Sequence, residues 1–66
     1  MIESIDYGTQ TIEFEVQRKK ACKNTYITVE RDIGVVVKTN VDISLEELKT
    51  LVKSKAKWIL KKFEEI

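Results

Sequence analysis

Histidine and proline are absent from this sequence of 66 residues, cysteine occurs once and glycine occurs twice. Without histidine the chain lacks the commonest general base and the usual ligands of a zinc site. The single cysteine, Cys22, has no second cysteine for a disulfide and no histidine to support a nucleophilic role. We therefore expect a chain that is not an enzyme, needs no cofactor or metal, and carries a reduced thiol of the kind found in the cytoplasm.

Long apolar runs and a large net charge are missing too. No segment approaches the roughly 20 apolar residues of a membrane span, and the N-terminal MIESIDYG lacks the basic and apolar regions of a signal peptide. The net charge is +1, so electrostatic recognition depends on local clusters of charge and not on the field of the whole molecule. With 42% apolar and 35% charged residues, we expect one small globular domain over residues 1–66, without membrane contact.

The first half of the chain alternates between apolar and polar side chains, which is the pattern of half-buried strands. In the segment 10–17, Ile12 and Phe14 alternate with glutamates. Three consecutive valines at 35–37 predict a strand that is buried on more than one side. Gly8 is suited to the positive φ of a tight turn. The expected strands cover residues of about 2–5, 10–17, 25–31 and 34–39.

The period of the apolar residues changes after Ser44. Ser44 and Glu47 have the spacing of a capping box, so a helix is expected to begin there. The apolar stripe that follows, at steps of three and four, contains Leu45, Leu48, Val52, Ala56, Ile59, Phe63 and Ile66. It predicts one long helix over about 45–65, or two helices if the chain breaks near Ser54 and that residue caps the second. The fold class is α+β, with the helix packed on one face of an antiparallel sheet of about four strands.

Three further apolar residues, Leu51, Trp58 and Leu60, lie at the edges of this stripe. We expect the large indole of Trp58 to anchor the helix in the core. Together the three residues make the stripe wider than a sheet of four strands covers. Self-association through the helix is therefore one interpretation of the excess.

Two groups of basic residues stand out. The first consists of Arg18, Lys19, Lys20 and Lys23, and the second is a ladder of Lys49, Lys53, Lys57 and Lys61 on the polar side of the helix. One interpretation is solvated charge, which also discourages strand edges from pairing with one another. The other is a joint surface that neutralises several phosphates of a nucleic acid. The second interpretation requires the two groups to converge on one face.

Most of these features fall in two stretches, IEFEVQRKKACKNTYITVERDIGVVVKT and LEELKTLVKSKAKWILKKF. Together they resemble the N-terminal region of the YgjP-like metal-dependent hydrolases, predicted zinc peptidases related to the SprT and WLM groups. In that family a hairpin, a basic stretch, a strand, a glycine turn and a valine-rich strand precede a helix that ends in a basic residue and Trp-Ile. The resemblance covers nearly the whole chain. The segment VVVKTN departs from it, because in the family that strand ends in a proline.

The catalytic part of that family carries His-Glu-x-x-His and a third zinc ligand, and this sequence contains no histidine. None of the family's catalytic residues therefore carries over. The resemblance implies an accessory domain that packs on a zinc peptidase domain or presents protein substrate to it, either within a longer enzyme or as a separate module. The expected mark of this role is an apolar patch that stays exposed in the isolated domain. The alternative function is a nucleic-acid-binding module that uses the basic residues.

Overall fold

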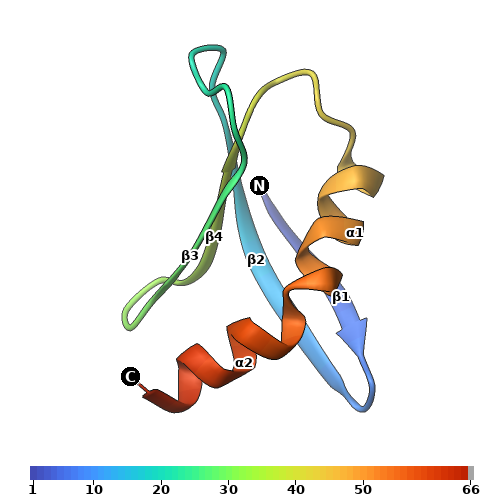
Figure 1. Cartoon of the computed structure of the whole chain (residues 1–66), viewed down its shortest axis with the longest axis vertical. Helices are drawn as coiled ribbons and strands as arrows, with labels where there is room; N and C mark the ends of the chain where they lie inside the picture. The colour runs from blue at the N-terminus through green and yellow to red at the C-terminus, as the bar shows by residue number, and fades with distance from the viewer. Residues whose placement is uncertain (66) are drawn as a thin grey trace.

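Two β-hairpins and two helices make up the fold in the computed structural model, which describes residues 1–65 (Figure 1). The strands are β1 (Ile2–Tyr7), β2 (Gln10–Arg18), β3 (Tyr26–Glu30) and β4 (Gly34–Thr39), and the helices are α1 (Leu45–Ser54) and α2 (Ala56–Glu65). This arrangement confirms the predicted α+β class and the order of four strands followed by helix. Within residues 1–65, neither helix is long and apolar enough to cross a membrane.

The sheet has the strand order β1-β2-β4-β3, and it is mixed. β1 pairs with β2 and β3 pairs with β4 in antiparallel fashion, whereas β2 and β4 run parallel. The prediction of an antiparallel sheet is therefore wrong for the central pair. The physical reason is the burial of Val35, Val36 and Val37, which are each at most 2% exposed. A strand as apolar as β4 is most stable in the interior of the sheet. The segment 19–25 therefore carries the chain past the place next to β2, and the β3–β4 hairpin then brings β4 back into that place.

The first hairpin is closed by two residues, Gly8 and Thr9, because Tyr7 pairs with Gln10. Gly8 has a φ of +63°, and no residue other than glycine has a positive φ within the described part of the chain. Of the two turn residues, only the first, Gly8, has a positive φ, which is the pattern of a type II′ turn. The twist of this turn matches the twist of the flanking strands. The turn sets the register of β1 on β2 as the alternating pattern predicts.

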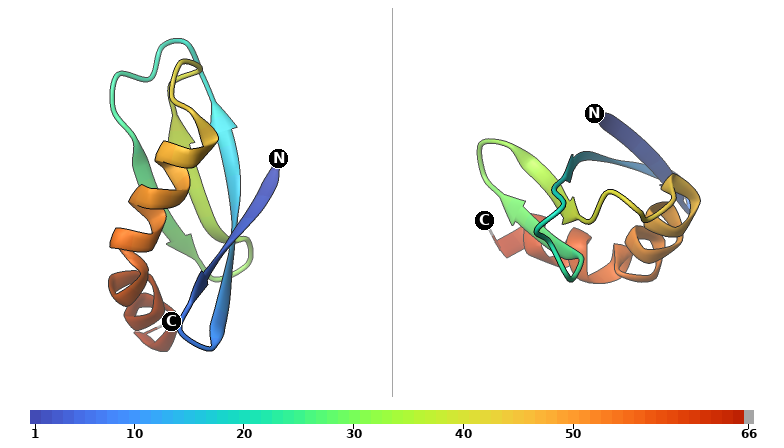
Figure 2. Two further views of the ribbon diagram at one scale, coloured as in Figure 1. Left: turned by 90° about the vertical axis from the view of Figure 1, so that its right-hand side faces the viewer. Right: turned by 90° about the horizontal axis from the view of Figure 1, so that it is seen from above.

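Both helices lie on the same face of the twisted sheet, with α1 beside β1 and α2 beside β3 (Figure 2). The strand residues that alternate toward this face form the core together with one side of each helix. The core consists of Ile5, Ile12, Phe14, Val16, Val35, Val37, Leu48, Val52, Ala56 and Ile59. Val36 points to the opposite face of β4 and is buried there among its neighbours on the sheet. The prediction that the valines are buried on more than one side is confirmed.

The helix begins as predicted, since the hydroxyl of Ser44 accepts a hydrogen bond from the N–H of Glu47 at 3.1 Å. One long helix was the wrong expectation, because the chain breaks at Lys55, with φ −103° and ψ 6°. The break is where the alternative placed it. Ser54 has a different role from the predicted one, because its hydroxyl donates to the carbonyl of Leu51 in α1 at 2.6 Å. A straight helix of this length would span about 30 Å, and the break lets the apolar stripe follow the curved sheet.

The predicted stripe is buried in its middle and exposed at its end. Leu48, Val52, Ala56 and Ile59 are fully buried, whereas Phe63 is 44% exposed. Ile66, the last residue assigned to the stripe, lies outside the described residues.

The expected core role of Trp58 is also wrong. Its side chain is 42% exposed, and the ammonium of Lys62 lies 5.7 Å from the centroid of its ring. Trp58 precedes the buried Ile59 by one residue, which is about 100° around the helix, so the indole lies beside the core and not in it.

Arg18 holds the connection between β4 and α1 in place. Its guanidinium donates to the carbonyl of Asn40 at 3.3 Å and to the carbonyl of Ile43, and the side chain is half-buried. These two carbonyls belong to the segment that turns the chain from the sheet toward the first helix. Arg18 is therefore a structural residue, and its Nη1 is engaged inside the domain.

Replacing Leu48 by alanine tests the helix–sheet core. Leu48 is fully buried, with 0% of its surface accessible to solvent. Leu48→Ala is therefore expected to lower the free energy of unfolding by about 2–5 kcal/mol. The half-buried Leu51 of the same helix is the matched control, and Leu51→Ala should cost clearly less. Urea unfolding followed by circular dichroism measures both. Equal losses would contradict the described packing.

Arg18 and its exposed neighbour Lys19 form a second matched pair. Removing hydrogen bonds from a charged donor to half-buried carbonyls costs more than removing a solvated charge, so Arg18→Ala should lower the unfolding free energy by about 1–3 kcal/mol. Lys19→Ala should change it by less than about 0.5 kcal/mol. The urea midpoints of the two variants compare them directly. If both variants were as stable as the wild type, Arg18 would have no structural role.

Candidate functional site

The first basic group lies in the segment 19–25, which is firmly attached to the end of β4. The N–H of Lys19 donates to the carbonyl of Thr39 at 2.9 Å, and the amide of Asn40 donates to the carbonyl of Cys22 at 2.8 Å. The hydroxyls of Thr25 and Thr39 are 2.8 Å apart. The side chains of Lys19, Lys20 and Lys23 are exposed at this end of the molecule, while that of Arg18 points inward to its two carbonyls.

The second basic group, the lysine ladder, is divided by the break at Lys55. Lys49 and Lys53 belong to α1, and Lys57 and Lys61 belong to α2, whose axis runs at an angle to that of α1 (Figure 1). The ammonium of Lys49 lies 3.6 Å from the carboxylate of Glu3 on β1. The ladder therefore consists of two separate pairs, one of which is partly neutralised.

The two basic groups do not converge. The segment 19–25 lies at one end of the long axis of the molecule and α2 lies near the other end (Figure 1), and that axis extends over 32 Å. Of the eight basic residues considered for nucleic-acid binding, Lys19, Lys20 and Lys23 share the segment 19–25, and the four lysines of the ladder remain as one pair on each helix. The segment 19–25 and the α2 half of the ladder therefore do not share one face.

A different feature is found where β4 is shorter than β2. The parallel pairing of the two strands begins with Phe14 opposite Val35, whereas β1 pairs with β2 from Gln10 onward. Within residues 1–65, the segment 10–13 of β2 therefore has a sheet partner on one side only. Its other backbone edge faces a gap between the sheet and α2, which we call the free edge of β2.

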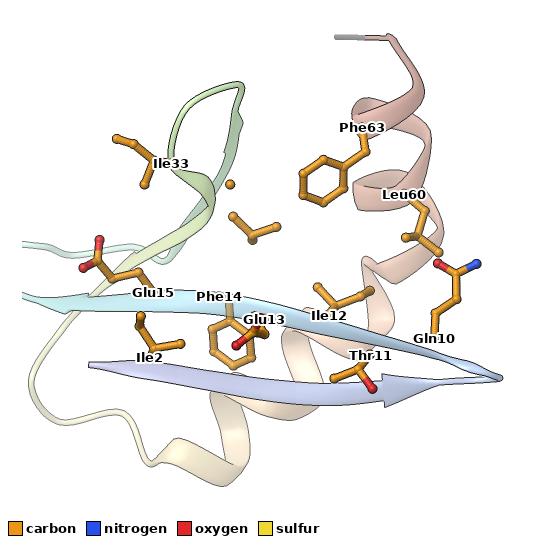
Figure 3. Close-up of a pocket in the computed structure, with 12 residues that line it drawn as sticks. Ile2, Gln10, Thr11, Ile12, Glu13, Phe14, Glu15, Ile33, Leu60 and Phe63 are labelled. Carbon is orange, nitrogen blue, oxygen red and sulfur yellow. The ribbon is translucent and has the colours of Figure 1, made fainter.

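The gap beside this free edge is an apolar groove, shown in Figure 3. Its floor is formed by β2, one wall by α2 and the other by the start of β4 and the turn before it. The apolar residues that line it are Ile12, Phe14, Ile33, Val35, Leu60 and Phe63. Two of them are large and strongly exposed, since Ile33 is 63% accessible and Phe63 is 44% accessible. The groove has a volume of about 670 Å³, which is in the range of protein binding sites.

The groove is acidic along its outer rim. Glu13 and Glu15 line it from the face of the sheet opposite the helices, and Ile2, which pairs with Glu15, is exposed beside them (Figure 3). Among the described residues that line the groove there is no lysine or arginine. The carboxylate of the exposed Glu13 is therefore available to a positively charged partner at this place, while that of the half-buried Glu15 accepts a hydrogen bond of 3.3 Å from the side-chain amide of Gln17.

The sequence analysis did not predict the groove, because it treated Glu13 and Glu15 only as the polar positions of an alternating strand and Phe63 as a member of the apolar stripe. One local signal pointed to it, because Ile33 is a large apolar residue in a turn that is otherwise polar. The rest depends on the parallel register of β4, which no local pattern specifies.

The residues that the structure describes offer binding surfaces. Within residues 1–65, no three side chains of the histidine, cysteine, aspartate or glutamate type gather closely enough to hold a metal ion. Comparison of the chain with models of known protein families, with curated proteins and with solved structures gives no match.

Proposed function

We propose that this chain is a non-catalytic accessory domain that binds another protein through the apolar groove beside the free edge of β2. The partner that the resemblance to YgjP-like hydrolases suggests is a zinc peptidase domain or its protein substrate. The single observation that carries the proposal is the groove itself, which places exposed apolar side chains next to an unpaired strand edge. The isolated accessory domain was expected to carry such an apolar patch.

The exposure of Ile33 and Phe63 supports a protein partner. A domain of this size has few apolar residues to spare for its core, because a small chain buries a smaller fraction of its surface on folding. Large exposed apolar residues that adjoin one another mark interaction sites on small soluble domains. A partner that covered Phe63 would remove an aromatic side chain from water, and such side chains supply much of the energy at protein interfaces.

The proposed role is binding and not catalysis, because of the residue types available. The zinc chemistry suggested by the resemblance needs His-Glu-x-x-His, and the sequence has no histidine. Glu13 and Glu15 lie on the same strand and the same side of the groove, so they do not face each other across a bound substrate. A catalytic part of the partner would have to supply the reacting groups.

The test is binding of this chain to the histidine-bearing catalytic domain of a YgjP-like hydrolase, supplied as a separate protein and measured by titration calorimetry. We expect Phe63→Ala to weaken binding at least about tenfold, because it removes an aromatic side chain from the interface. Trp58→Ala is the matched control, since Trp58 is an equally exposed aromatic of the same helix that does not line the groove. It should leave the affinity unchanged.

Two results would overturn the proposal. One is the absence of binding by a wild-type chain whose circular dichroism spectrum shows it to be folded. The other is binding that Trp58→Ala and Phe63→Ala weaken equally, because the groove would then have no special part in it.

The separation of the basic groups predicts weak binding to nucleic acid. We expect the affinity for a fluorescent duplex at about 150 mM salt to be no better than the non-specific range, about 10⁻⁴–10⁻⁶ M. Fluorescence anisotropy across a salt series measures it, with a single-stranded oligonucleotide for comparison. Tighter binding that Lys53→Glu with Lys57→Glu abolishes would favour the nucleic-acid-binding alternative instead.

A further inference from the structure

We propose that the free edge of β2 accepts an extended segment of the partner as an added strand, and that this segment carries apolar and basic side chains in alternation. The inference rests on the proposed function, because it specifies how the same groove is occupied. Adding a strand to a sheet edge is a general mode of peptide recognition, in which backbone hydrogen bonds supply affinity and alternate side chains supply specificity.

The backbone of β2 has the correct orientation for this pairing. The N–H of Val16 donates to the carbonyl of Met1 at 2.7 Å, which fixes the residues of β2 whose backbone groups point toward β1. Because this direction alternates along a strand, the even-numbered residues of β2 bond to β1 and the odd-numbered residues point the other way. Thr11 therefore directs its backbone groups toward the groove, and Glu13 follows at the point where the pairing of β2 with β4 begins.

The length of the free edge limits the added strand. Residues 10–13 precede the pair of Phe14 with Val35, and Gly34, the first residue of β4, lies one position earlier, so about three residues of a partner, or roughly 10 Å at 3.3 Å per residue, fit before β4 begins. The added strand would lie in line with β4, with the turn that contains Ile33 at one end of it.

The side of the added strand that faces the helices would meet apolar surface. Ile12 points to the helix side of β2, and Leu60 and Phe63 project from α2 over the same gap (Figure 3). Every second side chain of the partner would enter this space. A valine or isoleucine at these positions would bury apolar area against the exposed part of Phe63.

The opposite side of the added strand would meet the acidic rim. Glu13 lies on the face away from the helices at the end of the free edge, and Glu15 follows it on the same face, beside Val36 of β4. Opposite charges on neighbouring strands contribute about 0.2–1 kcal/mol per pair, and like charges in that position are destabilising. The intervening side chains of the partner are therefore expected to be lysine or arginine.

The same carboxylates disfavour a second copy of this chain as the occupant. If two free edges of β2 paired with each other, the Glu13 carboxylates of the two copies would be brought to the same short edge. Charged residues on an edge are a general means of preventing such pairing. Charge complementarity thus selects a basic partner segment over self-association.

The test uses the peptide acetyl-Val-Lys-Val-Lys-Val-Lys-Val-amide and the full chain, with binding followed by calorimetry and by chemical-shift changes. The informative variant is Thr11→Pro, which removes an N–H from the free edge while β1 keeps its own partners. Thr11→Ala is the matched control, because both changes remove the hydrogen bond of 3.2 Å from the Thr11 hydroxyl to Asp6 but only proline removes the N–H. Circular dichroism checks that both variants fold.

We expect the peptide to bind the wild type and Thr11→Ala equally and to bind Thr11→Pro at least about tenfold more weakly. The chemical-shift changes should be largest at residues 10–13. A peptide methylated on alternate backbone nitrogens, which changes nothing in the protein, should also bind more weakly. A peptide with glutamate in place of lysine should bind more weakly still, and Glu13→Gln with Glu15→Gln should reduce the preference for lysine.

Several results would overturn the inference, and they separate it from the proposed function. Equal binding to Thr11→Pro and Thr11→Ala, with no effect of methylation, would mean that the groove is occupied in another way. Sedimentation showing self-association that Thr11→Pro abolishes would make a second copy the occupant. If no peptide bound but the catalytic domain bound in a manner that depended on Phe63, the strand pairing would be wrong and the accessory role would stand.

Discussion

The burial of the three valines of β4 is the constraint on which the rest of the structure depends. A strand that is apolar on both faces is stable only inside the sheet, so β4 lies between β2 and β3. The chain reaches this place through the segment 19–25 and the β3–β4 hairpin, and that path makes β4 parallel to β2. Because β2 has nine residues and β4 has six, and their pairing begins at Phe14, the first part of β2 keeps a free edge. The groove is a direct consequence of where the most apolar strand lies.

The helices complete the groove because of the break at Lys55. In α1 the buried Leu48 and Val52 cover the side of the sheet near β1, and in α2 the buried Ile59 covers the side near β3. The change of direction carries the end of α2 past the paired part of the sheet, so Phe63 has β2 on one side and solvent on the other. One straight helix over the same residues would have required a flatter sheet. The exposed aromatic side chain and the free edge are therefore two results of one geometry.

Local patterns in the sequence predicted the strands, the first turn and the helix start. They did not predict the features that depend on residues far apart in the sequence. Alternation identified β2 and β3, the three valines identified β4, Gly8 identified the first turn, and Ser44 with Glu47 identified the helix start, because each depends on residues close in sequence. The parallel pair was not predictable in this way, since its partners are more than 20 residues apart and a strand pattern does not name its neighbour. The helix break has no glycine or proline to announce it. The groove depends on both features, so the one local signal, the apolar Ile33 in a polar turn, was not enough to locate it.

The groove and the stability of the domain are linked. An added strand beside residues 10–13 would give the free edge of β2 its missing hydrogen-bond partners and would cover Phe63, so it would complete the sheet that β4 leaves short. Any ligand that binds only the folded state raises the free energy of unfolding as its concentration rises above its dissociation constant. In a domain this small, whose own core is limited, that contribution is a substantial fraction of the total. The partner segment would thus stabilise the domain that recognises it. A segment with alternating apolar and basic side chains would be favoured both by its contacts with the acidic rim and by its pairing with the free edge of β2.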